Sequence, residues 1–111
     1  PKEEEEELVV PEITPRQLAE RRSELFLVDV REPHEVDIAK IDGAHLIPLR
    51  EVSSRFGELD PDKEIVVHCR SGKRSAAAVH FLMGQGFNNI HNLRGGILAW
   101  SDEVDPAIAK Y

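Results

Sequence analysis

The chain has 111 residues, of which 41% are hydrophobic, 32% are charged and one is a cysteine. This length suits one packed domain and is short for two. A single cysteine cannot form an internal disulfide, and no stretch near the N-terminus has the pattern of a signal peptide. No apolar run approaches the roughly 20 residues of a membrane helix. We therefore expect a cytoplasmic protein that has no contact with a membrane.

The formal net charge is −7, and the lysine and five glutamates of residues 2–7 account for −4 of it. A weakly acidic body without a basic stripe argues against nucleic acid as a partner. The block of like charge predicts that residues 1–8 are a disordered acidic linker and that residues 9–111 form the folded domain. Because the first residue is Pro rather than Met, we expect the chain to have been processed or cut from a longer polypeptide.

Helical and strand patterns alternate along the remaining chain. Thr14, Pro15 and Gln17 have the arrangement of an N-cap, a first-turn proline and a capping box. The predicted helices are 15–22, 50–57, 75–83 and a last one that opens at Gly95-Gly96 and contains Trp100. Short apolar runs predict strands at 25–30, 45–48, 64–68 and 90–93. This alternation predicts an α/β domain with a mostly parallel sheet that is covered by helices on both faces.

Polar residues follow two of the predicted strands. Asp29-Val30-Arg31 ends the first of them, and His68-Cys69 ends the strand at 64–68. In parallel α/β sheets, ligands bind at the carboxyl ends of the strands. If the two strands are parallel, these groups therefore meet at one edge of the sheet.

The only cysteine is followed by a loop rich in donors and positive charge: Arg70, Ser71, Gly72, Lys73 and Arg74. If a helix starts at Ser75, the amides of residues 70–75 curl around the sulfur, and the helix N-terminus adds about half a positive charge. Such settings favour the thiolate, which is the nucleophilic form of cysteine. The three cations are expected to bind an anionic substrate, and Gly72 to allow a tight turn at positive φ.

Other interpretations of these residues stay open. Cys69 could be an ordinary buried core residue, Lys73 a solvated surface cation and Gly72 a plain turn residue. His68 precedes Cys69 directly, and adjacent strand residues point to opposite faces, so we interpret it as a core or supporting histidine. One cysteine and five scattered histidines show no close metal-ligand spacing, and we expect neither a metal site nor a cofactor.

Two chemistries use a cysteine surrounded by loop amides in this way: phosphate ester hydrolysis and sulfur transfer through a persulfide. Cysteine phosphatases place five residues between the cysteine and an arginine, which leaves room for a tetrahedral phosphate. Here only four residues separate Cys69 from Arg74, and Ser75 stands at the phosphatase spacing. A persulfide sulfur is smaller than a phosphoryl group, so the shorter loop favours sulfur transfer.

From about Ile13 to Trp100 the chain resembles the rhodanese-like domain family. The motifs that carry the resemblance are Leu27-Val28-Asp29-Val30-Arg31-Glu32, Ile41-Asp42-Gly43-Ala44-His45-Leu46-Ile47-Pro48-Leu49, the loop Cys69 to Arg74, and Leu93-Arg94-Gly95-Gly96-Ile97-Leu98-Ala99-Trp100. The resemblance implies a five-stranded, mostly parallel sheet flanked by helices. It also implies that Cys69 alternates between thiol and persulfide, that residues 70–74 supply the amide cradle, and that Asp29 and Arg31 make supporting or substrate contacts.

A narrower resemblance joins Glu32-Pro33-His34-Glu35-Val36, Ile38-Ala39 and the segment from Val104-Asp105-Pro106 to Tyr111. These residues are similar to the C-terminal rhodanese domains of E1-like adenylyltransferases that serve molybdopterin, thiamine or tRNA-thiolation pathways. The resemblance implies a ubiquitin-like sulfur carrier and an E1-like adenylyltransferase as partners.

The expected activity is sulfur transfer with ping-pong kinetics. The donor would be thiosulfate or the persulfide of a cysteine desulfurase, and the acceptor cyanide in an assay or an activated sulfur carrier in the cell. The alternatives are a non-catalytic rhodanese-like binding module and a cysteine phosphatase or arsenate reductase.

Overall fold

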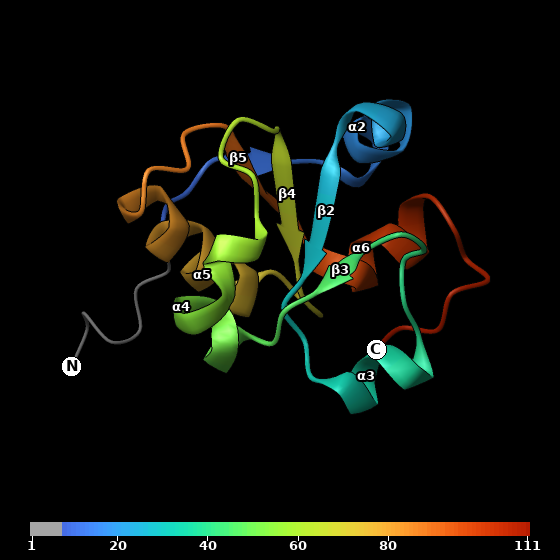
Figure 1. Ribbon diagram of the computed structural model, residues 1–111. Helices are drawn as coiled ribbons and strands as arrows, with labels where there is room; N and C mark the ends of the chain where they lie inside the picture. The colour runs from blue at the N-terminus through green and yellow to red at the C-terminus, as the bar shows by residue number, and fades with distance from the viewer. Residues whose placement is uncertain (1–7) are drawn as a thin grey trace.

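The computed structural model describes residues 8–111, which form an α/β fold around one five-stranded sheet (Figure 1). The predicted acidic linker, apart from Leu8, lies outside the described residues. The strands lie in the order β1-β5-β4-β2-β3, and every pair is parallel. Their bounds are β1 Glu12–Ile13, β2 Phe26–Asp29, β3 His45–Leu46, β4 Ile65–His68 and β5 Ile90–Leu93.

Helices cover both faces of the sheet (Figure 1). The α-helices are α2 Pro15–Glu20, α3 Pro33–Ile38, α4 Val52–Arg55, α5 Lys73–Gly84 and α6 Gly96–Glu103. Short 3₁₀ turns are η1 Arg22–Glu24, η2 Leu49–Glu51 and η3 Phe56–Glu58. None of the helices within residues 8–111 is long and apolar enough to cross a bilayer.

The two faces of the sheet bury separate clusters of side chains, because alternate residues of a strand point to opposite faces. On one face, Val28 and Val67 pack against α4 and α5. On the other face, Leu27 and Val66 pack against α2 and α6, with Trp100 at the margin. The central strands are therefore apolar on both sides, as the continuous runs predict.

Most predicted elements are present. The strands predicted at 25–30, 45–48 and 64–68 are one or two residues shorter, and three helices differ in extent. The capping box of Thr14 and Gln17 is confirmed, with α2 ending at Glu20 rather than residue 22. The segment predicted as one helix at 50–57 is divided among η2, α4 and η3. The helix predicted to start at Ser75 begins at Lys73, because Gly72 takes a φ of 109° and serves as its N-cap. Strand β1 and helix α3 were not predicted, since neither has a long apolar pattern.

Asp29 and His68 are register partners on the neighbouring strands β2 and β4. The chain leaves both strands at the same edge of the sheet, where the segments leading to Arg31 and Cys69 begin. This confirms that the polar groups at the two strand ends meet. Helix α3 and the C-terminal residue also lie at this edge (Figure 1).

Candidate active site

Cys69 lies directly after β4 and is fully buried. Its sulfur accepts hydrogen bonds from the backbone N–H of Gly72, at 3.1 Å, and of Ser75, at 3.4 Å. The positive φ of Gly72 turns the loop back over the sulfur, as expected for a glycine at this position. The loop therefore forms an amide cradle around Cys69, and two of its amides reach the sulfur.

The cradle sits at the N-terminus of helix α5, which has 12 residues. The amides of Lys73 and Arg74 have no acceptor within the part of the chain that the structure describes. These free donors and the helix dipole place partial positive charge beside the sulfur. This arrangement can stabilise negative charge beside the sulfur.

The start of α6 fixes the other side of the loop. The N–H groups of Ile97 and Leu98 donate to the carbonyl oxygens of Cys69 and Arg70, at 2.9 and 3.2 Å. Gly96 permits this close approach, because a Cβ atom there would lie 2.6 Å from the Cys69 carbonyl oxygen. Gly96 of the Leu93–Trp100 motif thus allows α6 to bind the cysteine loop.

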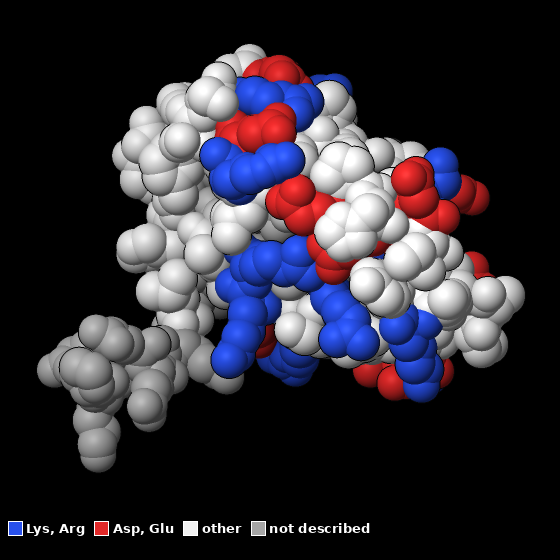
Figure 2. Space-filling model, turned by 90° about the horizontal axis from the view of Figure 1, so that it is seen from below, with Lys and Arg blue, Asp and Glu red and all other residues white. Residues whose placement is uncertain are grey.

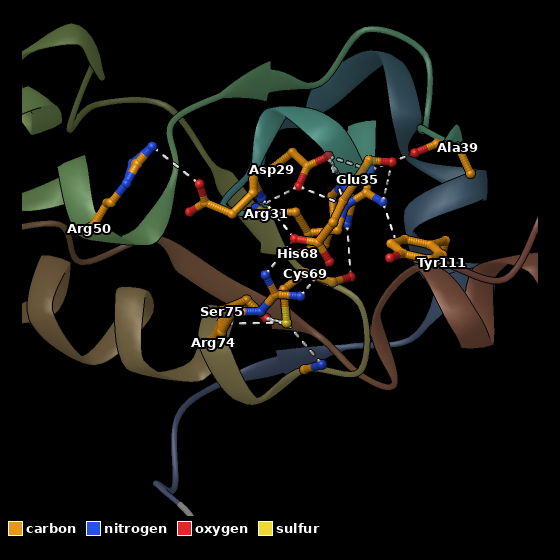
Figure 3. A network of polar contacts seen from close by, with 12 residues as sticks. Asp29, Arg31, Glu35, Ala39, Arg50, His68, Cys69, Arg74, Ser75 and Tyr111 are labelled. Carbon is orange, nitrogen blue, oxygen red and sulfur yellow. Dashed lines mark hydrogen bonds and ion pairs between the residues drawn. The ribbon is translucent and has the colours of Figure 1, made fainter. Parts of the chain in front are cut away.

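Arg31 is fully buried and links the end of β2 to α3 and to Tyr111 (Figure 3). Its Nε and Nη2 atoms donate to the two carboxylate oxygens of Asp29, at 3.0 and 2.8 Å. The remaining N–H groups reach backbone oxygens of Glu35, Ala39 and Tyr111. All five N–H donors of Arg31 therefore have acceptors within the protein.

Glu35 of α3 binds Arg74 of the loop through two parallel hydrogen bonds of 2.7 and 2.8 Å (Figure 3). The Arg74 guanidinium lowers the pKa of Glu35 to about 2, and the carboxylate in turn raises the pKa of Arg74. Sequence reasoning assigned Arg74 to the substrate but did not find Glu35. The pair neutralises one of the three cations of the loop.

We expect Glu35→Gln to weaken the protein most near neutral pH. The folded-state pKa of Glu35 lies below its ordinary value of 4.5, so its stabilising contribution is complete above pH 4.5. It is lost as the pH falls from 4.5 to about 2. The variant should lose on the order of 1–3 kcal/mol at pH 7, and its stability should fall less steeply below pH 4.5. Urea unfolding at a series of pH values measures both effects.

Glu20→Gln is the matched control, because Glu20 is an exposed residue of α2. It should reproduce the acid profile of the unmodified protein. An unchanged profile for Glu35→Gln would show that the ion pair contributes nothing to folding.

Two cations of the loop remain accessible. Arg70 and Lys73 are exposed, and the Arg70 guanidinium lies 5.6 Å from the centre of the Tyr111 ring. Seen from the side of the strand ends, lysine and arginine side chains gather in a band across the surface (Figure 2). Ser71 is exposed beside them. The mouth of the cradle is thus cationic, as a site for an anion requires.

His68 is buried on the face opposite Cys69 and lies beside Asp29. Its Nδ1 atom is 3.2 Å from the Cys69 carbonyl oxygen, and its Nε2 atom is 3.5 Å from an Asp29 carboxylate oxygen. Burial lowers the pKa of His68, which favours the neutral imidazole. The side chain therefore lies beneath the site and does not pair with the sulfur of Cys69.

The structure brings the sequence-predicted residues of the two strand ends and the loop into one site. It adds Glu35, Asn92, Tyr111 and the hydroxyl group of Ser75, which the sequence analysis did not assign. Asn92 could have been found from the sequence, because it is a polar residue within the strand predicted at 90–93. Tyr111 carried none, since only the folded chain brings it to Arg31.

The structure thus places a buried cysteine in a cradle of backbone amides at the carboxyl edge of a parallel sheet. The family model "Rhodanese-like domain" matches residues 14–103. The chain belongs to the rhodanese-like domain family.

Relatives and solved structures agree with this assignment. A "Sulfurtransferase" of Allochromatium vinosum is 38% identical over 104 residues, which cover 91% of this chain and 97% of that protein. The "Probable adenylyltransferase/sulfurtransferase MoeZ" of Mycobacterium tuberculosis is 40% identical over 104 residues, 89% of this chain but 26% of that protein. The crystal structure of a rhodanese-related protein from Thermoplasma volcanium has a TM-score of 0.83 and 35% identity, and the match covers 92% of this chain and 100% of that one.

The chain spans only part of some relatives. It covers 31% of "Rhodanese-like/PpiC domain-containing protein 12, chloroplastic" from Arabidopsis thaliana, with 40% identity over 92 residues. Such relatives hold further domains beside the rhodanese-like one.

Proposed function

We propose that this protein is a sulfurtransferase that carries sulfane sulfur as a persulfide on Cys69. The observation that carries the proposal is the short loop whose amides donate to the Cys69 sulfur, with four residues between Cys69 and Arg74. The names of the relatives from A. vinosum and M. tuberculosis support the same activity. The fold alone would not, because one fold hosts many functions.

In the first step, the thiolate of Cys69 attacks the outer sulfur of a donor such as thiosulfate. A sulfur–sulfur bond forms to Cys69, the sulfur–sulfur bond of thiosulfate breaks, and sulfite leaves with the bonding electron pair. The product is the persulfide anion on Cys69. The unpaired amides of Lys73 and Arg74 and the N-terminus of α5 stabilise the charge of its outer sulfur.

In the second step, a nucleophile removes the outer sulfur. With cyanide, a carbon–sulfur bond forms, the persulfide bond breaks, and thiocyanate leaves while Cys69 returns to the thiolate. The two half-reactions are separate displacements, so ping-pong kinetics follow. Neither step needs a metal or a cofactor.

The cations that meet the donor are Arg70 and Lys73, because Glu35 already neutralises Arg74. We expect Arg70→Glu and Lys73→Glu each to raise the KM for thiosulfate about tenfold, since a charge-assisted contact becomes a repulsion. Steady-state kinetics with cyanide as acceptor measures the effect. Arg16→Glu on α2 is the control with the same change in net charge, and an equal rise in its KM would contradict a local donor site.

The test of the proposed function is the intact mass of the purified protein after thiosulfate, and again after cyanide. We expect a gain of one sulfur atom that cyanide removes. No gain from thiosulfate or from a persulfidated cysteine desulfurase would contradict sulfur transfer. It would favour the binding-module alternative, whereas turnover of a phosphomonoester that depends on Cys69 would favour the phosphatase or arsenate reductase alternative.

The physiological partners are a further part of the proposal. The MoeZ relative joins an adenylyltransferase and a sulfurtransferase by name. We propose a cysteine desulfurase or an anionic small molecule as donor. The proposed acceptor is a ubiquitin-like sulfur carrier that an E1-like adenylyltransferase has activated.

A further inference from the structure

A buried asparagine on the strand next to Cys69 contacts both residues that bond the sulfur. Asn92 lies in β5 and is 3% exposed. Its Nδ2 atom donates to the Gly72 carbonyl oxygen at 3.0 Å, and its Oδ1 atom accepts from the Ser75 hydroxyl at 2.6 Å. Gly72 and Ser75 are the two residues whose backbone N–H groups reach the Cys69 sulfur.

The orientation of the Asn92 amide follows from its partners. The Gly72 carbonyl oxygen can only accept a hydrogen bond, so the NH₂ group must face it. The amide oxygen then faces Ser75, whose hydroxyl can donate to it. The oxygen and the nitrogen of one rigid amide group are thus bound to Ser75 and Gly72.

Asn92 also occupies a position that packing alone would fill with an apolar residue. It is the register partner of Val67 on β4. Ile90, two residues earlier on the same face of β5, belongs to the apolar cluster with α5. A buried amide is unfavourable unless it is hydrogen-bonded, and here its side-chain bonds go to the loop.

The Ser75 hydroxyl has two acceptors and one hydrogen. Its oxygen lies 3.3 Å from the Cys69 sulfur and 2.6 Å from Asn92 Oδ1. When the sulfur carries a proton, the thiol can donate to the Ser75 oxygen while Ser75 donates to Asn92. When the sulfur is an anion, the hydroxyl can turn from Asn92 toward it.

We propose that Asn92 is a positioning residue for sulfur transfer, holding Gly72 and Ser75 so that their donors face the Cys69 sulfur. The proposal rests on the proposed function of Cys69. Asn92 contacts neither the donor nor the sulfur and acts through the loop. Its loss should therefore slow the attack of Cys69 and leave donor affinity unchanged.

The test is Asn92→Asp, which keeps the size of the side chain but replaces the donor to Gly72 with a carboxylate oxygen. We expect the first-order rate of persulfide formation at saturating thiosulfate to fall about tenfold, from the lost hydrogen bond, with the KM for thiosulfate unchanged. The rate at which iodoacetamide alkylates Cys69 should fall as well. Asn89→Asp, at an exposed asparagine just before β5, is the control for net charge. Asn92→Ser adds no charge and should slow both rates as well, because it also removes the hydrogen bond to Gly72.

A merely structural role would lower the thermal midpoint of Asn92→Asp and leave both rates at those of Asn89→Asp, and that result would overturn the proposal. If Asn92→Asp does not fold, Asn92→Ser, which is too short to reach both partners, is judged by the same rates. If the unmodified protein takes up no sulfur, the proposed function fails. The alkylation rates then still decide whether Asn92 positions Cys69.

Discussion

Cys69→Ser is expected to abolish sulfur uptake from thiosulfate and the release of thiocyanate in the presence of cyanide. A serine oxygen can still accept the amide hydrogen bonds of Gly72 and Ser75, so the loop and the fold should persist. It cannot form a persulfide, because the sulfur–sulfur bond requires the cysteine thiolate. Intact mass and steady-state turnover measure the loss, and far-UV circular dichroism checks the fold.

The control places a thiol elsewhere on the same molecule. Ser53 is exposed on α4, so Ser53→Cys in the Cys69→Ser background restores one cysteine without a cradle. We expect this double variant to form no persulfide that cyanide removes. Equal activity of a surface thiol would mean that the loop is unnecessary, and turnover by Cys69→Ser alone would end the proposed mechanism.

Arg31→Met is expected to have the largest effect on stability. Arg31 and Asp29 are both buried, and the methionine would leave the Asp29 carboxylate without its main partner. Removing one member of a buried ion pair costs about 3–5 kcal/mol. The variant also frees the backbone oxygens of Ala39 and Tyr111, which Arg31 binds. Chemical denaturation, read from Trp100 fluorescence, measures the loss.

Two further variants make this prediction specific. Arg94→Met removes an exposed arginine that pairs with Glu12, and we expect it to cost less than about 1 kcal/mol. The double variant Asp29→Asn/Arg31→Met should lose less unfolding free energy than the sum of the losses in the two single variants, because it leaves no unpaired buried charge. Additive losses would show that the pair is not energetically coupled.

Much of the site could be predicted from sequence because its parts are local. Cys69 and the loop to Arg74 are contiguous, and parallel strands bring their carboxyl ends to one edge, so the meeting of Asp29 with His68 followed from the fold class. The sequence predicts that α5 starts at Ser75, but the helix begins two residues earlier, at Lys73. Gly72 takes a positive φ and serves as the N-cap. Local sequence preference favoured Ser75 as the start.

The fold class, the family resemblance and the position of the single cysteine followed from the sequence alone. Apolar periodicity and short motifs depend only on residues that are close together in the chain. Only the tertiary structure decided the use of each charge. In the folded protein Arg74 pairs with Glu35 and Arg31 is buried. Asn92 binds Gly72 of the loop, and Tyr111 contacts both Arg31 and Arg70. These pairings join residues far apart in the chain, with Tyr111 and Arg31 separated by 80 positions. Their partners are set by packing in three dimensions, which no local pattern records.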